Sequence, residues 1–183
     1  VVAEQIHEQV GTIRARTDRQ LAMARVAGTG SHDLNTVPLI GKLVAALRLL
    51  PDERKIEWVT KLPNEIRVAV DPTDFAEAIG NILDNAARYA RSKIVVSATR
   101  GEGMVKLVIE DDGPGIDDDD LVRMLRRGQR ADESDTGNGL GLAISSDIAH
   151  AYGASISLSR SSLKGLAVTT TWPLVRVGAN AMA

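Results

Sequence analysis

The sequence predicts an α+β protein, built as a two-layer α/β sandwich with a mixed sheet under a layer of helices and preceded by a long bundle helix. Three observations lead to this prediction. Apolar residues recur at a helical period over 1–26 and again over 72–89. Runs rich in Val and Ile, which favour strands, follow the second of these segments. Helical and strand segments that alternate in so short a chain are typical of one sheet covered by helices.

The composition is that of a soluble globular protein, and it excludes several kinds of chemistry. Of 183 residues, 44% are hydrophobic and 25% are charged, which fits one domain with a modest extension. The net charge is only −2, so we expect no nucleic-acid partner. The lack of cysteine excludes disulfides, thiolate metal sites and a cysteine nucleophile. No apolar run approaches the roughly 20 residues that span a bilayer, so we expect no membrane segment in this fragment.

The helix predicted over 1–26 has a thin apolar stripe and cannot be buried by itself. We therefore expect it to be one helix of a bundle that is incomplete here. Glycines at 28 and 30 end the helical pattern and indicate a linker. We therefore predict four parts along the chain: a partial bundle helix (1–27), a linker (28–36), a main domain (37–174) and a flexible tail (175–183).

The main domain is expected to begin with a helix that Asn35 or Thr36 caps and that ends near Leu50. The longer helix over 72–89 can be capped by Asp71 or Thr73. Two strands are predicted over 55–62 and 65–70, separated by a turn at Pro63-Asn64, and a hairpin is predicted from strands over 93–99 and 104–109. A short helix over 119–127, a polar loop over 128–138 and a helix over 140–152 follow. The last predicted elements are a closing pair of strands over 155–160 and 166–172.

Polar groups form a stripe along the helix over 72–89. They are separated by steps of four, four and three residues and therefore share one helix face: Glu77, Asn81, Asn85 and Arg88. Apolar residues occupy the opposite side: Phe75, Ile79, Ile82, Leu83 and Ala86. Amides and a guanidinium in this arrangement suit a metal-bound phosphate chain, and oxygen ligands without cysteine suit Mg²⁺. The alternative is an ordinary solvated helix face.

Two glycine-rich loops strengthen the case for a nucleotide. Asp111 ends a strand directly before the turn with Gly113 and Gly115, and its carboxylate can accept a hydrogen bond from an exocyclic amine such as that of adenine. The second loop opens a helix, where backbone N–H groups suit a phosphate; its residues include Gly137, Gly139, Leu140 and Gly141. The glycine spacing matches neither a P-loop nor a Rossmann fingerprint.

Charged clusters lie beside the second loop. Four arginines fall within eight residues, and one or two of them can reach a γ-phosphate, although a solvated basic helix face explains each one equally well: Arg123, Arg126, Arg127 and Arg130. The acidic run Asp117–Asp120 is interpreted as helix capping, because acids are favoured at a helix start. A second cation site is the alternative interpretation of that run.

In this order and with these intervals, the sequence from about Val37 to Pro173 resembles the ATP-binding domain of sensor histidine kinases, within the GHKL superfamily. The N box is Asn81–Tyr89, the G1 box 111–115 and the G2 box 137–141. The resemblance is greatest to PhoQ-like sensors, in which 128–130 replaces the aromatic F box. It implies a Bergerat-type ATP fold with ATP and Mg²⁺ as cofactors.

The resemblance also implies roles for individual residues. Asn85 would be the Mg²⁺ ligand, and Asn81 and Arg88 would contact phosphates. Tyr89 would lie beside the nucleoside, and Asp111 would read the adenine. The remaining residues that it assigns to the nucleotide lie in the glycine loops and beside the ATP lid formed by 128–138: Gly113, Gly115, Arg130, Gly137, Gly139, Leu140 and Gly141.

Phosphoryl transfer to a histidine is the reaction that we expect, with Asn81, Arg88 and Arg130 as catalytic residues. In the hydrolysing members of the superfamily a Glu stands four residues before the metal-binding Asn, where this chain has Asn81. An amide cannot take the proton of water. Glu77 lies a further turn back, roughly 6 Å along the helix, and would be poorly placed. An ATPase or clamp of the same superfamily, and a non-catalytic nucleotide-binding module, are the alternatives.

The histidine that accepts the phosphoryl group is expected upstream of this chain. His32 lies in a stretch that resembles a phosphoacceptor box, but between a glycine break and a helix start. His7 is expected to be solvated and His150 to cap its helix. The resemblance therefore implies that 1–27 is the second helix of the dimerisation hairpin. The implied partners are the phosphoacceptor helix of the same kinase, a second subunit in a homodimer and a response regulator, with the fragment forming the cytoplasmic portion of an inner-membrane sensor.

Overall fold

The computed structural model describes residues 33–50, 54–116 and 141–175. Four predicted segments therefore lie outside the described residues, the last of them apart from residue 175: the first helix, the short helix over 119–127, the loop over 128–138 and the tail over 175–183. The described elements follow the chain in this order: β1 (Leu34–Asn35), α2 (Thr36–Arg48), β2 (Glu57–Lys61), β3 (Arg67–Val68), α3 (Pro72–Tyr89), β4 (Lys93–Arg100), β5 (Met104–Asp111), α5 (Gly141–Ala151), β6 (Ser155–Arg160) and β7 (Leu166–Pro173).

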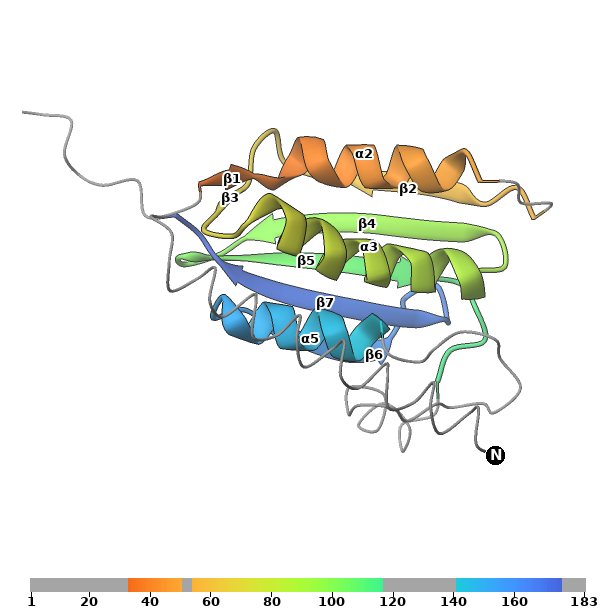
Figure 1. The fold of residues 1–183 in the computed structure, drawn as a ribbon. Coiled ribbons are helices and arrows are strands. Elements are labelled where there is room, and N and C mark those ends of the chain that lie inside the picture. The colour runs from red at the N-terminus through yellow and green to blue at the C-terminus, as the bar shows by residue number, and fades with distance from the viewer. Residues whose placement is uncertain (1–32, 51–53, 117–140, 176–183) are drawn as a thin grey trace, which may run out of the picture.

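A five-stranded sheet forms one layer, with the strand order β2-β4-β5-β7-β6. β2 pairs with β4 in parallel, whereas every other neighbouring pair is antiparallel. Helices α2, α3 and α5 lie side by side over one face of this sheet (Figure 1). The predicted mixed sheet under a layer of helices is therefore confirmed. None of the described helices is both long and apolar enough to cross a bilayer.

Helix α3 lies over the centre of the sheet and supplies much of the core. Asp71 caps it as predicted, because its side chain accepts hydrogen bonds from the backbone N–H groups of Thr73 and Asp74. All five residues of the predicted apolar face are buried. Phe75 packs against Trp172 of β7, with ring centroids 5.2 Å apart and planes inclined at 57°. This packing fixes the face of α3 that points away from the sheet.

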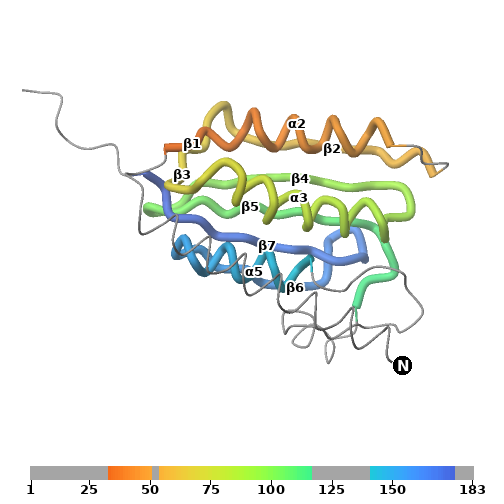
Figure 2. Tube along the Cα trace, in the orientation of Figure 1, coloured from red at the N-terminus to blue at the C-terminus, as the bar shows by residue number. Residues whose placement is uncertain are grey.

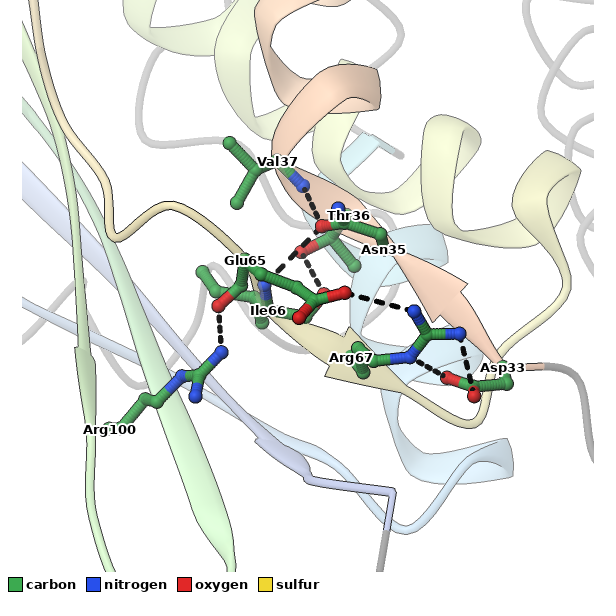
Figure 3. A network of polar contacts seen from close by, with 8 residues as sticks. All are labelled: Asp33, Asn35, Thr36, Val37, Glu65, Ile66, Arg67 and Arg100. Carbon is green, nitrogen blue, oxygen red and sulfur yellow. Dashed lines mark hydrogen bonds and ion pairs between the residues drawn. The ribbon is translucent and has the colours of Figure 1, made fainter. Parts of the chain in front are cut away.

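The segment that enters α2 differs from the prediction. The strand expected over 65–70 contains only β3, which pairs with the unpredicted strand β1 in a separate two-stranded sheet. The turn at Pro63-Asn64 therefore does not join neighbouring strands of one sheet. Asn35 caps α2 as predicted, and the same side-chain oxygen also accepts the N–H of Ile66 (Figure 3). Because the Asn35 side-chain oxygen accepts hydrogen bonds from both segments, it holds residues 33–37 against residues 65–68.

The same corner carries the polar network drawn in Figure 3. The Arg67 guanidinium donates two hydrogen bonds to Asp33, at 2.8 and 2.7 Å, and one to Glu65 at 2.9 Å. Arg100 donates to the backbone carbonyl of Glu65. The Asp33–Arg67 pair is exposed, so we expect it to contribute little to stability.

Helix α5 runs beside α3 (Figure 2), and two side chains form hydrogen bonds to α3. The buried Ser145 hydroxyl lies 2.8 Å from the carbonyl oxygen of Ala78 in α3 and 2.9 Å from that of Gly141 in its own helix. Directly after the last residue of α5, the Tyr152 hydroxyl donates to the buried Asp74 carboxylate in the first turn of α3. These contacts bring the first residue of α5 to the polar stripe of α3.

Candidate functional site

Asp111 ends β5 as a buried carboxylate that is only partly satisfied by the protein. Its side chain is 3% exposed. Oδ1 accepts the N–H of Gly113 at 2.8 Å and the N–H of Leu166 at 3.2 Å. Among the described residues no donor reaches Oδ2. Burial raises the pKa of Asp111, although the two backbone N–H groups act in the opposite direction. A buried acceptor without a partner is unusual in a native protein and indicates a ligand.

The loop after Asp111 touches the C-terminal end of α3. A Cβ atom added at Gly113 would lie 2.5 Å from the carbonyl oxygen of Tyr89, so no larger residue fits there. Gly115 has a φ of 74°, which favours glycine. The strand end that carries Asp111 is thus held directly against the last turn of the helix that carries Asn81 and Asn85.

Gly165 and Leu166 are parts of this site that the sequence interpretation missed. A Cβ atom at Gly165 would overlap with Oδ1 and the carbonyl oxygen of Asp111, and would lie 2.6 Å from the nitrogen of Gly113. Leu166 supplies the second backbone N–H to Asp111. Gly165 was visible as a glycine before the last strand. Nothing in the sequence, however, indicates that this turn lies on a carboxylate more than fifty residues away.

Asp112 is a further polar group of the site that was not predicted. Its carboxylate accepts hydrogen bonds from the N–H groups of Arg91, Ser92 and Lys93 and from the Ser92 hydroxyl. Partial burial alone would raise the pKa of Asp112. The hydrogen bonds from Ser92 and its backbone neighbours outweigh burial and hold that pKa well below its usual range. Asp112 is therefore a charged acceptor that ties the loop to the start of β4.

The polar stripe of α3 has the exposure expected of a binding surface. Asn81 and Asn85 are half-buried, whereas Arg88 is exposed and lies 3.7 Å from Asp84 in an ion pair one helical turn away. Tyr89 is 40% exposed. A Cβ atom at Gly141 would lie 3.5 Å from Cβ of Asn81, so the first residue of α5 adjoins the stripe. The stripe, the strand end and the start of α5 therefore gather at one end of the helix layer.

Four of the predicted site residues lie outside the described residues: Arg130, Gly137, Gly139 and Leu140. The other arginines of the basic cluster and the run 117–120 lie outside them too. In the part of the chain that the structure describes, no three side chains of His, Cys, Asp or Glu gather in a way that could hold a metal ion. The amide oxygen of Asn85 fits a Mg²⁺ ion that takes its other ligands from phosphates and water.

Comparison with known proteins gives one family. A family model described as "Histidine kinase-, DNA gyrase B-, and HSP90-like ATPase" matches residues 70–176, more than half of the chain. Sensor protein kinase CarS of Pseudomonas aeruginosa is 39% identical over 182 residues, which cover 97% of this chain and 40% of CarS. Virulence sensor histidine kinase PhoQ of Salmonella typhimurium is 33% identical over 162 residues, which cover 86% of this chain and 33% of PhoQ. The chain thus spans less than half the length of these two relatives.

Solved structures have the same architecture. The mycobacterial sensor histidine kinase MprB has a TM-score of 0.69 at 25% identity, over 79% of this chain and 98% of that one. The nucleotide-free catalytic domain of histidine kinase ThkA has a TM-score of 0.71 at 20% identity, over 80% of this chain and 97% of that one. The second likeness shows the fold alone.

Proposed function

Because this chain belongs to the family of histidine kinase-, DNA gyrase B- and HSP90-like ATPases, we propose that it is the catalytic part of a sensor histidine kinase. It binds Mg-ATP and transfers the γ-phosphoryl group to a histidine on a separate helix. The observation that carries the proposal is Oδ2 of the buried Asp111, which no donor in the described part of the chain reaches. That oxygen needs a donor, and the exocyclic amine of adenine is one.

The adenine subsite is built around Asp111. Its Oδ1 accepts two backbone N–H groups, so we assign the base to Oδ2, which receives no hydrogen bond from residues 33–50, 54–116 or 141–175. Gly113 and Gly165 bring their backbone directly against the Oδ1 side of the carboxylate, where a Cβ atom at either residue would collide with Asp111, and so hold the carboxylate in place. Tyr89, partly exposed beside this loop, supplies apolar surface for the nucleoside.

The phosphates are assigned to the stripe of α3 and to the start of α5. Asn81 and Arg88 contact them, and Asn85 holds the Mg²⁺, which neutralises charge on the phosphates. The N-terminus of α5, which begins beside Asn81, adds backbone N–H groups and the positive end of the helix dipole. We also assign Arg130, Gly137, Gly139 and Leu140 to this side of the nucleotide.

The residue at 81 favours transfer to histidine over hydrolysis. An amide takes no proton from water, so water gains no base at this position. A histidine brings its own nucleophilic ring nitrogen. That nitrogen bonds to the γ-phosphorus while the bond from phosphorus to the β,γ-bridging oxygen breaks, and ADP leaves with the electron pair. Positioning and neutralisation of charge, by Asn81, Arg88 and Arg130, are then the main tasks of the protein.

The names of the relatives support a wider setting for the domain. As part of a sensor kinase, it would work in a homodimer, with 1–27 as the second helix of the dimerisation hairpin and with the acceptor histidine on the first. A response regulator would receive the phosphoryl group. The parent protein would be an inner-membrane sensor with this fragment on its cytoplasmic side.

Phosphoryl transfer in trans tests the proposal. The chain is incubated with labelled ATP, Mg²⁺ and a separately produced acceptor hairpin from the full-length kinase. We expect an acid-labile label on the hairpin, its loss in Asn85→Ala, and no change in Asn64→Ala, which replaces an exposed asparagine outside the site. Rapid release of phosphate without a labelled hairpin would instead indicate an ATPase or clamp. Nucleotide binding with neither outcome would indicate a non-catalytic module.

A further inference from the structure

The connection between α3 and β4, residues 87–93, is held by two charged side chains from other parts of the chain. The guanidinium of Arg54, which lies before β2, donates to the carbonyl oxygens of Ala87, Arg88 and Ala90 at 2.8, 2.8 and 2.9 Å. Carbonyl groups in the last turn of a helix lack partners within the helix and form the negative end of its dipole. The guanidinium of Arg54 both donates hydrogen bonds to these carbonyl groups and places a positive charge at the negative end of the dipole.

The carboxylate of Asp112 holds the next part of the same connection. It accepts the N–H groups of Arg91 at 2.8 Å, Ser92 at 3.0 Å and Lys93 at 3.1 Å, and the Ser92 hydroxyl at 2.6 Å. The N–H of Asp112 in turn donates to the carbonyl oxygen of Lys93 at 3.2 Å. Carbonyls are thus held by a cation and amides by an anion, within seven consecutive residues.

These contacts join the two halves of the proposed nucleotide site. Arg88 and Tyr89, which we assign to the phosphates and the nucleoside, lie in the helical turn that Arg54 caps. Asp112 lies in the chain between Asp111 and Gly113, and Gly113 packs against the carbonyl of Tyr89. The spacing between the acceptor for the base and the last turn of α3 is therefore set by the connection that both charges hold.

We propose that Arg54 and Asp112 are positioning residues for nucleotide binding, which fix the last turn of α3 relative to Asp111 without touching the nucleotide. The inference rests on the proposed function. Arg54 and Asp112 are expected to affect the binding of different parts of the nucleotide. Asp112 holds the strand end that reads the base, whereas Arg54 holds the helical turn that faces the phosphates.

Titrations with ATP and with inorganic tripolyphosphate, which has no base, test the inference in the 183-residue chain. For Asp112→Ala we expect ATP to bind about tenfold more weakly, because displacement of Asp111 weakens its hydrogen bond to the base and a hydrogen bond to a charged group is worth about one decade. The affinity for tripolyphosphate, which lacks the base, should change less than about twofold. For Arg54→Ala we expect both ligands to bind more weakly. Asp112→Asn, which keeps one acceptor oxygen for the backbone N–H groups, should restore ATP binding to within about threefold.

The matched controls are Asp33→Ala and Arg67→Ala, which remove an exposed Asp and Arg from the hydrogen-bonded cluster near the start of α2. They should leave both affinities unchanged. If Asp112→Ala does not fold, Asp112→Ser replaces it with the same expectation. Unchanged ATP affinity in the Asp112 variant, or an equal loss for ATP and tripolyphosphate, would overturn the inference. A wild-type chain that binds neither ligand would instead overturn the proposed function.

Discussion

Replacement of Gly165 by alanine is the most demanding test of how the site is packed. The added methyl group would overlap with the side chain and carbonyl of Asp111 and would lie 2.6 Å from the nitrogen of Gly113. Two of these three neighbours are backbone atoms, and the third belongs to a buried carboxylate that two N–H groups hold in place. None of them can move without displacing the loop that carries Asp111.

The loss of stability caused by Gly165→Ala can be estimated from these contacts. Overpacking of a close-packed region costs about 1–3 kcal/mol. If the turn shifts enough to break the hydrogen bond from Leu166 to Asp111, a bond to a charged group is lost as well, which is worth about 1.5–3 kcal/mol. We therefore expect Gly165→Ala to lower the free energy of unfolding by about 2–4 kcal/mol. We also expect it to weaken ATP binding by about tenfold or more.

Urea unfolding and a fluorescent ATP analogue measure the two effects. The matched control is Gly41→Ala in α2, where an added Cβ atom meets nothing within 4 Å. Because alanine favours a helix over glycine, this variant should gain up to about 1 kcal/mol and bind ATP normally. A Gly165→Ala protein as stable as wild type, with unchanged affinity, would show that the turn is not packed on Asp111 as described.

Three further predictions concern stability. Lys164 has a φ of 78°, a left-handed conformation that strains any residue with a side chain. Lys164→Gly should therefore raise the free energy of unfolding, measured with urea, by about 0.5–1 kcal/mol, and a decrease in that free energy would contradict the strain. Since the pKa of Asp112 is lowered in the folded state, the stability difference between wild type and Asp112→Ala should be full above the unfolded pKa of 3.8 and decline as the pH falls below it; a difference that grows in acid would refute this sign. Phe75→Ala should lower the free energy of unfolding by about 3–5 kcal/mol, because the Phe75 ring is fully buried against Trp172. The variant should also change the Trp fluorescence of the folded protein, and an unchanged fluorescence spectrum would contradict this packing.

Local patterns in the sequence were sufficient to predict the elements that local physics determines. The polar–apolar periodicity of 72–89 and the capping acid Asp71 predicted α3, and its apolar face is buried as expected. The glycines at 101 and 103 predicted the hairpin of β4 and β5, which pair in antiparallel register. Such features depend on residues a few positions apart, so the sequence contains all that they require.

Features that depend on distant partners were not predicted. The two-residue strands β1 and β3 have no periodicity to detect, and their pairing depends on Asn35 and Thr36 meeting Ile66 across about thirty residues. The sequence placed Asp111 at the end of a strand directly before a glycine turn, but the second N–H donor to its carboxylate comes from Leu166 in the last strand. For the same reason the sequence did not identify Asp112 as an acceptor for the residues that lead into β4.

The central claim is that Oδ2 of Asp111 accepts the exocyclic amine of a bound adenine. It is tested most directly by calorimetric titration of wild type and Asp111→Asn with ATP and with the triphosphate of purine riboside, which lacks that amine. Wild type should prefer ATP by about tenfold or more, which corresponds to one hydrogen bond to a charged group, and Asp111→Asn should lose this preference. Equal affinity of wild type for the two ligands, or a preference that survives in Asp111→Asn, would contradict the assignment of the base to this carboxylate.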